Sequence, residues 1–122
     1  MRKTHGNLQE LGAAGEREVS TYLHNRGIRI VERNWRIKGG EIDLIAEDAG
    51  TIVFVEVKTR TSFAYGTPLE AITPEKAFRL QRLALAWMAT HQRWGQDYRI
   101  DCAGVWMDGR GACEIDYRKA VL

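Results

Sequence analysis

The sequence predicts an α/β sandwich, in which a mixed β-sheet is flanked by helices in the order α-β-β-β-α-β-β. Two observations lead to this prediction. In segments 8–26 and 74–92, apolar residues recur at three- and four-residue steps, as they do on one face of a helix. In other runs apolar and polar residues alternate, as in half-buried strands. These predicted strands are 28–36, 41–47, 51–59, 98–106 and 113–117.

Local signals support the individual elements. Gly27 is a typical stop for the first helix, and Thr73-Pro74 is a typical start for the second. Small residues at positions 12–15 indicate that the first helix closely approaches another backbone. Gly39-Gly40 separates the first two strands, and the composition of residues 60–73 predicts an irregular loop.

The length and composition are those of one globular domain. Hydrophobic residues make up 44% and charged residues 28% of the 122 residues, which excludes a mostly disordered chain. We expect residues 8–122 to form a single nuclease-like domain after a flexible N-terminus at residues 1–7. No apolar run approaches the roughly 20 residues needed to span a bilayer, and no apolar segment follows the basic start. We therefore expect no membrane association.

Two cysteines, Cys102 and Cys113, are too few for a fold stapled by disulfides. They lack C-x-x-C spacing and neighbouring histidines, so they do not indicate a zinc site. A single disulfide would require that they face each other on paired strands. We expect reduced thiols and a cytoplasmic location.

The second and third predicted strands form a hairpin that brings two acids together. A turn at residues 48–51 sets Asp43 opposite Glu56 and Glu41 opposite Lys58. Directly opposed residues of an antiparallel pair point to the same face of the sheet. The hairpin therefore predicts a cluster of charged side chains on one face.

Apolar neighbours indicate that this face is at least partly covered. Glu56 and Lys58 share it with Ile52 and Phe54, and buried carboxylates are costly unless they are paired or bound to a metal. One alternative is a cross-strand salt bridge of Lys58 with Glu41 or Glu56. The apolar run around Glu56 favours a functional site over that alternative. In the second strand, the same alternation places three apolar residues on one face: Ile42, Leu44 and Ala46.

This combination of residues suits metal-dependent hydrolysis of phosphodiester bonds. Magnesium prefers a few carboxylate ligands with waters completing its shell, and Asp43 and Glu56 supply two. Such a cation polarises a phosphoryl oxygen and makes a bound water more acidic. Lys58 would lower the pKa of the attacking water or stabilise charge on the phosphate. There is no phosphate-binding glycine loop of the Walker type, so we expect no nucleotide cofactor.

Basic residues are concentrated beside these strands. The net charge is only +2, but residues 26–38 contain five basic residues and one acid. A basic surface around an acidic pocket is expected of an enzyme that acts on a polyanion, and a solvated basic face is the alternative. We predict that Arg33, Arg36 and Lys38 contact a nucleic-acid backbone. Arg60 would contact a phosphate or be solvated.

The residues around the acid pair resemble a known family. Asp43 followed by Glu56-Val57-Lys58 resembles the D…(D/E)-x-K motif of restriction-endonuclease-like nucleases. A longer pattern over residues 8–107 resembles the YraN-like bacterial proteins, a family that is similar to archaeal Holliday-junction resolvases. The pattern comprises Gly12-x-x-Gly15-Glu16, Tyr22-Leu23, Gly27, Arg33-Asn34-x-Arg36, residues 40–46, residues 53–58, Arg60, Gly66 and Lys76.

The resemblance implies a restriction-endonuclease-like fold and roles for the site residues. Asp43 and Glu56 would bind Mg²⁺ or Mn²⁺ together with the backbone carbonyl of Val57, and Lys58 would be the catalytic lysine. Resolvases carry a glutamate followed by an arginine on the first helix, which Glu16-Arg17 matches. The alternative for Glu16 is a solvated acid. The proline that often precedes the motif aspartate is absent here.

We therefore expect a Mg²⁺- or Mn²⁺-dependent endonuclease that cuts branched or single-stranded DNA, with Glu16 assisting the metal site. Enzymes that act on symmetric DNA are often dimers, so we expect a homodimer. One alternative is a nucleic-acid-binding module that has the nuclease fold without robust catalysis. Another is a protein-interaction domain in DNA processing that uses the exposed side of helix 74–92.

Overall fold

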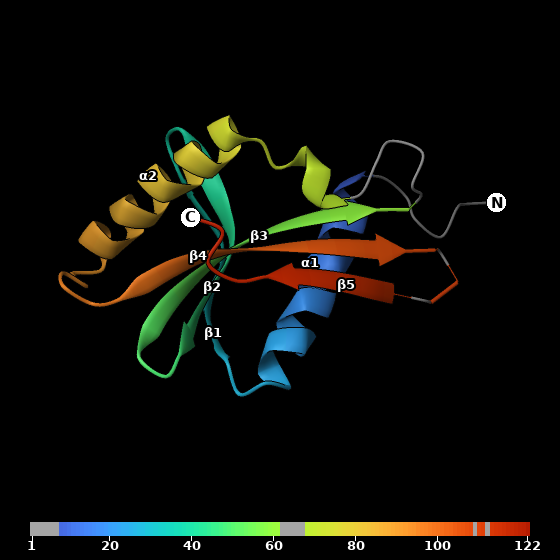
Figure 1. The fold of residues 1–122 in the computed structure, drawn as a ribbon, viewed down its shortest axis with the longest axis horizontal. Helices are drawn as coiled ribbons and strands as arrows, with labels where there is room; N and C mark the ends of the chain where they lie inside the picture. Colours follow the sequence, from blue (N-terminus) through green and yellow to red (C-terminus); the bar gives the residue numbers. More distant parts are fainter. Residues whose placement is uncertain (1–7, 62–67, 109, 112) are drawn as a thin grey trace.

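The computed structural model describes residues 8–61, 68–108, 110–111 and 113–122 (Figure 1). The prediction of a restriction-endonuclease-like α/β sandwich is confirmed, because two α-helices and a five-stranded mixed sheet follow one another in the predicted order. The predicted flexible N-terminus at residues 1–7 and residues 62–67 of the predicted loop lie outside the described residues. The elements are α1 (Leu8–His24), β1 (Arg29–Ile37), β2 (Gly40–Asp48), β3 (Thr51–Arg60), the 3-10 helix η1 (Pro68–Ala71), α2 (Pro74–Thr90), β4 (Tyr98–Met107) and β5 (Cys113–Arg118).

The sheet has the strand order β1-β2-β3-β4-β5. The first three strands form an antiparallel meander, β4 runs parallel to β3, and β5 returns antiparallel to β4. Parallel neighbours need a crossover connection, and η1 and α2 supply it between β3 and β4. Helix α2 therefore covers one face of the sheet and α1 covers the other (Figure 1). Within the described part of the chain, no helix is long and apolar enough to cross a membrane.

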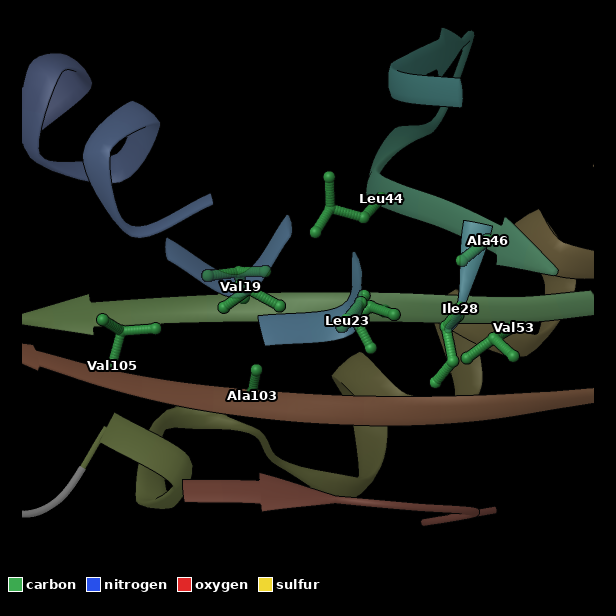
Figure 2. Close-up of a cluster of buried hydrophobic side chains, with 10 residues drawn as sticks. Val19, Leu23, Ile28, Leu44, Ala46, Val53, Ala103 and Val105 are labelled. Atoms are coloured by element: carbon green, nitrogen blue, oxygen red, sulfur yellow. The ribbon is translucent and has the colours of Figure 1, made fainter. Parts of the chain in front are cut away.

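The hydrophobic core has two layers, one on each side of β3. Alternate residues of β3 enter different layers, as predicted: Val53, Val55 and Val57 pack on the α1 side, whereas Ile52 and Phe54 pack on the α2 side. A polar side chain in this strand is therefore largely removed from water. Side chains of the α1-side layer shown in Figure 2 are Val19, Leu23, Ile28, Leu44, Ala46, Val53, Ala103 and Val105.

The β2–β3 hairpin has the predicted register. Asp48 pairs with Thr51 and Leu44 pairs with Val55, so continuation of this register sets Asp43 opposite Glu56. Ala49 and Gly50 form the turn with φ angles of 50° and 91°. Positive φ at both central residues is the mark of a two-residue turn that matches the twist of the strands.

The predicted alternation of β2 is wrong at Ile42. Leu44 and Ala46 pack in the α1-side layer as expected, but Ile42 packs in the α2-side layer together with Ile45. Strict alternation would keep Ile42 on the same face as Leu44. The strand therefore changes face between them, at Asp43.

Strand β1 changes face at the same level. Arg33 hydrogen-bonds to Ser20 of α1, whereas Trp35 packs against the α2-side layer. The intervening Asn34 has a φ of 50°, a left-handed conformation that asparagine adopts more readily than most residues. The β1–β2 register sets Asn34 opposite Asp43. Both strands thus turn over at one place, and the candidate site forms there.

The two cysteines are free thiols. Cys102 lies buried in β4, where burial raises its pKa to about 11, and Cys113 lies exposed in β5. The β4–β5 register pairs Cys102 with Arg118 and Met107 with Cys113, so the two cysteines do not face each other.

Helix α1 approaches β3 very closely at Gly15, as the small residues at positions 12–15 predicted. A Cβ atom at Gly15 would lie 1.9 Å from Oγ1 of Thr59, so any other residue at this point would require a shift of the Thr59 side chain, the helix or the strand. Among the described residues, the buried Thr59 hydroxyl has no hydrogen-bond partner. At Gly12, by contrast, an added Cβ would meet nothing within 4 Å.

The substitutions Gly15→Ala and Gly12→Ala separate this contact from helix propensity. Both gain about 1 kcal/mol of intrinsic helix propensity, but only Gly15→Ala pushes α1 away from Thr59. Such overpacking typically costs roughly 1–3 kcal/mol. We expect Gly15→Ala to lower the free energy of unfolding in urea and Gly12→Ala to maintain or raise it. Equal changes in the two variants would contradict the close contact.

Candidate functional site

Asp43 and Glu56 lie at the centre of the candidate site, where β2 and β3 separate. The last residue pair of the β2–β3 ladder is Leu44–Val55. Beyond it, Oδ2 of Asp43 accepts a hydrogen bond of 2.8 Å from the backbone N–H of Val57. The carboxylate thus takes the place of a backbone acceptor. The carboxyl groups of Asp43 and Glu56 lie close enough for each to shift the pKa of the other, so the structure brings the predicted acid pair together.

Burial makes this acid pair difficult to ionise completely. Loss of surrounding water, followed by the charge of Glu56, raises the pKa of Asp43 to about 7. Burial also raises the pKa of Glu56, although its hydrogen bond to Asp43 and the charge of Lys58 oppose that rise. A buried pair of carboxyl groups is stabilised by a shared proton or by a bound cation. We therefore expect the acid pair to hold either a shared proton or a bound cation.

The backbone of Val57 forms one side of the acid pair. Its side chain packs in the α1-side layer, which fixes β3 at this point. The N–H and C=O groups of one strand residue point toward the same neighbouring strand. The carbonyl of Val57 therefore lies on the same edge of β3 as the N–H that binds Asp43. This is the edge at which the sequence predicted a carbonyl ligand.

Helix α1 brings Glu16 to the edge of the site. Oε1 of Glu16 accepts a 3.0 Å hydrogen bond from Nδ2 of Asn34, which also donates at 3.2 Å to Oε2 of Glu41. Burial raises the pKa of Glu16, and the charges of Asp43 and Glu41 add to this rise. Glu16 is thus a half-buried, hydrogen-bonded acid rather than a freely solvated one.

Asn34 was not among the predicted site residues. Its left-handed backbone turns β1 over, and its amide holds two carboxylates in place. A signal was present in the sequence, because asparagine is unfavourable inside a strand and Asn34 interrupts a predicted one. Side-chain chemistry alone did not reveal it, since an amide is neither a base nor a preferred metal ligand here.

Three cations act on the Glu56 side of the acid pair. Lys58 follows Glu56 by two residues in β3 and lowers its pKa, as do Arg79 and Lys76 of α2. These two residues lie in the first two turns of α2, which begins at Pro74. Arg79 was not predicted, because its approach to Glu56 depends on the path of the crossover between β3 and β4.

Glu41 is held by β1 rather than by β3. Its carboxylate forms a 3.1 Å ion pair with Nε of Arg36, its partner in the β1–β2 register. Its other oxygen accepts the hydrogen bond from Asn34. Lys58, which the hairpin set opposite Glu41, acts on the charge of Glu56 instead.

The four predicted nucleic-acid-binding residues lie in three places. Arg33 contacts α1, Arg36 and Lys38 lie at the end of the β1–β2 hairpin, and Arg60 ends β3 and donates to a backbone carbonyl. Contact of these residues with a nucleic-acid backbone stays a prediction.

The candidate metal ligands are few. Among the residues that the structure describes, no group of three or more His, Cys, Asp or Glu side chains is arranged to hold a metal ion. Mg²⁺ is commonly bound by one or two carboxylates, with waters in the remaining positions. Asp43 and Glu56 with the carbonyl of Val57 fit that pattern, and they lack the sulfur and nitrogen ligands typical of structural zinc.

Known proteins resemble this chain over most of its length. Residues 15–105, which include all the predicted site residues, match the model of the uncharacterised protein family UPF0102. A UPF0102 protein of Beutenbergia cavernae is 46% identical over 111 residues, which cover 91% of this chain and 94% of the relative. A UPF0102 protein of Nocardia farcinica is 47% identical over 117 residues, which cover 96% and 92%. The resemblance to YraN-like proteins is thereby confirmed, and the chain belongs to the UPF0102 family.

Proposed function

We propose that this protein is a cytoplasmic endonuclease that uses Mg²⁺ or Mn²⁺ to hydrolyse phosphodiester bonds in branched or single-stranded DNA. The observation that supports the proposal most strongly is the partly buried pair of Asp43 and Glu56, with Lys58 two residues further along β3. Two neighbouring acids withdrawn from water weaken the fold unless they are paired or bind a cation. A divalent cation beside a phosphodiester would offset that cost.

Each site residue has a role in this proposal. Asp43, Glu56 and the carbonyl of Val57 would hold the cation, and a cation bound there would supply Lewis-acid activation of the phosphate and of water. The ammonium group of Lys58 stabilises negative charge that develops on the phosphate. Glu16, held by Asn34 at the edge of the site, orients the attacking water and accepts its proton.

A second candidate function is a nucleic-acid-binding module of nuclease fold without robust catalysis. It is favoured by the small number of ligands, since only two carboxylates meet at the centre of the described site. Binding that weakens with salt but is never followed by cleavage would support this candidate. A homodimer as the acting form, and a protein-interaction role for α2, stay predictions from the sequence.

Removal of either central carboxylate tests the metal site. We expect Asp43→Asn and Glu56→Gln to reduce cleavage of labelled four-way junction, flap and single-stranded DNA by at least 100-fold in Mg²⁺ or Mn²⁺. The matched control is Glu114→Gln, which removes an exposed carboxylate from the edge strand β5. Circular dichroism checks that all three variants are folded. Wild-type cleavage by a folded Glu56→Gln variant would refute the proposed site.

Lys58→Ala separates catalysis from binding. Loss of one group that stabilises transition-state charge typically lowers kcat by about 10²–10³-fold. We expect a loss of this size, while the affinity for DNA in EDTA changes by less than about fivefold. Equal losses in cleavage and in affinity would show instead that Lys58 serves only to bind DNA.

The acid pair makes the stability of the metal-free protein depend on pH. The folded pKa of Asp43, about 7, lies above its ordinary value of 3.8, so folding favours the protonated form. Stability from this group is therefore present at low pH and is lost as the pH rises through the range between these values. We expect Asp43→Asn to raise the Tm in EDTA at pH 8 and to change it little at pH 4.

The same linkage predicts how a cation acts. Mn²⁺ replaces the proton of the acid pair, so its binding is weakened at acidic pH. Added Mn²⁺ should therefore raise the Tm of the wild-type protein more at pH 8 than at pH 5.5, and should leave Asp43→Asn unchanged. A Tm increase that is equal at both pH values would place the cation elsewhere.

A further inference from the structure

A pocket with both polar and apolar walls lies between α1 and β1, one helical turn from Glu16. Its volume is about 600 Å³, and it is lined by residues from the second half of α1 and from the start of β1. Hydroxyl and basic groups form its walls, and two isoleucines contribute apolar surface. The residues used below are Ser20, His24, Ile28, Arg29, Ile30 and Arg33.

The pocket and the candidate site lie next to each other along α1 and β1. Glu16, Ser20 and His24 are spaced by four residues, so they lie in one row on the helix. Glu16 accepts a hydrogen bond from Asn34, and Ser20 accepts one from Arg33, the preceding residue of β1. From Glu16 to His24 the helix rises about 12 Å. That length corresponds to about three nucleotide steps at 3.4 Å per nucleotide of one duplex strand.

Arg33 is the strongest candidate for an anion ligand in this pocket. No carboxylate of the described residues lies within ion-pairing distance of Arg33, although Glu16 acts on it from further away. Its hydrogen bond to Ser20 uses one of the five N–H donors of a guanidinium group. Arg29, by contrast, is already paired with Glu47. The pocket thus contains a positioned cation without a carboxylate partner.

We propose that this pocket holds the sugar-phosphate backbone of one DNA strand next to the bond to be cut, with Arg33 as the main phosphate ligand. The inference rests on the proposed function, because it takes DNA as the ligand of the adjoining site. Arginine forks bind phosphate oxygens through two parallel hydrogen bonds. Ile28 and Ile30 offer apolar surface to the deoxyribose carbons, and Ser20 fixes the guanidinium before the strand arrives.

The test measures binding without cleavage, in EDTA. The probes are a fluorescein-labelled 20-nucleotide single strand and a four-way junction, titrated at several KCl concentrations. We expect Arg33→Gln to weaken binding about fivefold or more. The slope of log K against log salt should fall by about 0.7–0.9, the loss of one phosphate contact. The matched control is Lys119→Gln, which makes the same charge change next to β5, at the opposite edge of the sheet.

Two further variants keep the test decisive if Arg33→Gln fails to fold. Arg33→Lys keeps the charge but loses the fork, and Ser20→Ala frees the guanidinium without removing it. Both should weaken binding by an intermediate amount. The proposal would be overturned if every folded Arg33 and Ser20 variant bound DNA with the same affinity as Lys119→Gln.

A DNA strand with single uncharged methylphosphonate linkages locates the contact. Each linkage is placed in turn on either side of the scissile bond, and the wild-type protein should lose affinity at one of them. Arg33→Gln should show no further loss at that linkage. An Arg33 effect on binding without any metal-dependent cleavage would support the pocket and refute the nuclease. Metal-dependent cleavage by the wild-type protein, together with unchanged DNA binding by Arg33→Gln, would support the nuclease and refute the pocket.

Discussion

The hydrogen bond from the Val57 N–H to the Asp43 carboxylate is the interaction on which the rest of the site depends. It satisfies a buried backbone donor at the point where the β2–β3 ladder ends, so the two strands separate without leaving that donor unpaired. The separation gives two carboxyl groups room to meet inside the sheet. The same bond turns the edge of β3 that carries the Val57 carbonyl toward them.

The fold compensates for these buried acids with the segment that precedes them. Ile52, Val53, Phe54 and Val55 are almost completely buried, on alternating faces of the sheet. Each such side chain contributes about 1.5–3 kcal/mol when it leaves water. A strongly anchored run thus leads directly into Glu56, and the acid is held where its ionisation is unfavourable. Stability from the first half of β3 thus offsets the cost of holding Glu56 in the second half.

Sequence patterns were sufficient for the parts of the site that depend on local rules. The β-branched run at 51–59 identified β3, and a two-residue turn at Ala49-Gly50 set the register that places Asp43 opposite Glu56. Tertiary context decided the rest. Strands β1 and β2 both change face where Asn34 lies opposite Asp43, so Ile42 packs on the other face, and the crossover brought Arg79 to Glu56. Neither effect is encoded in the spacing of residues along one strand.

The contact between Gly15 and Thr59 fixes the position of α1 relative to β3, and with it the positions of the site residues on α1. Glu16 follows the contact directly, and Ser20 lies one turn beyond it on the same face. An inserted or deleted residue between positions 15 and 20 would rotate one relative to the other by about 100°. The carboxylate of Glu16 and the Ser20 hydroxyl that positions Arg33 would then no longer face β1 together. A change in the length of α1 therefore leaves these two contacts in line only before Gly15 or after Ser20.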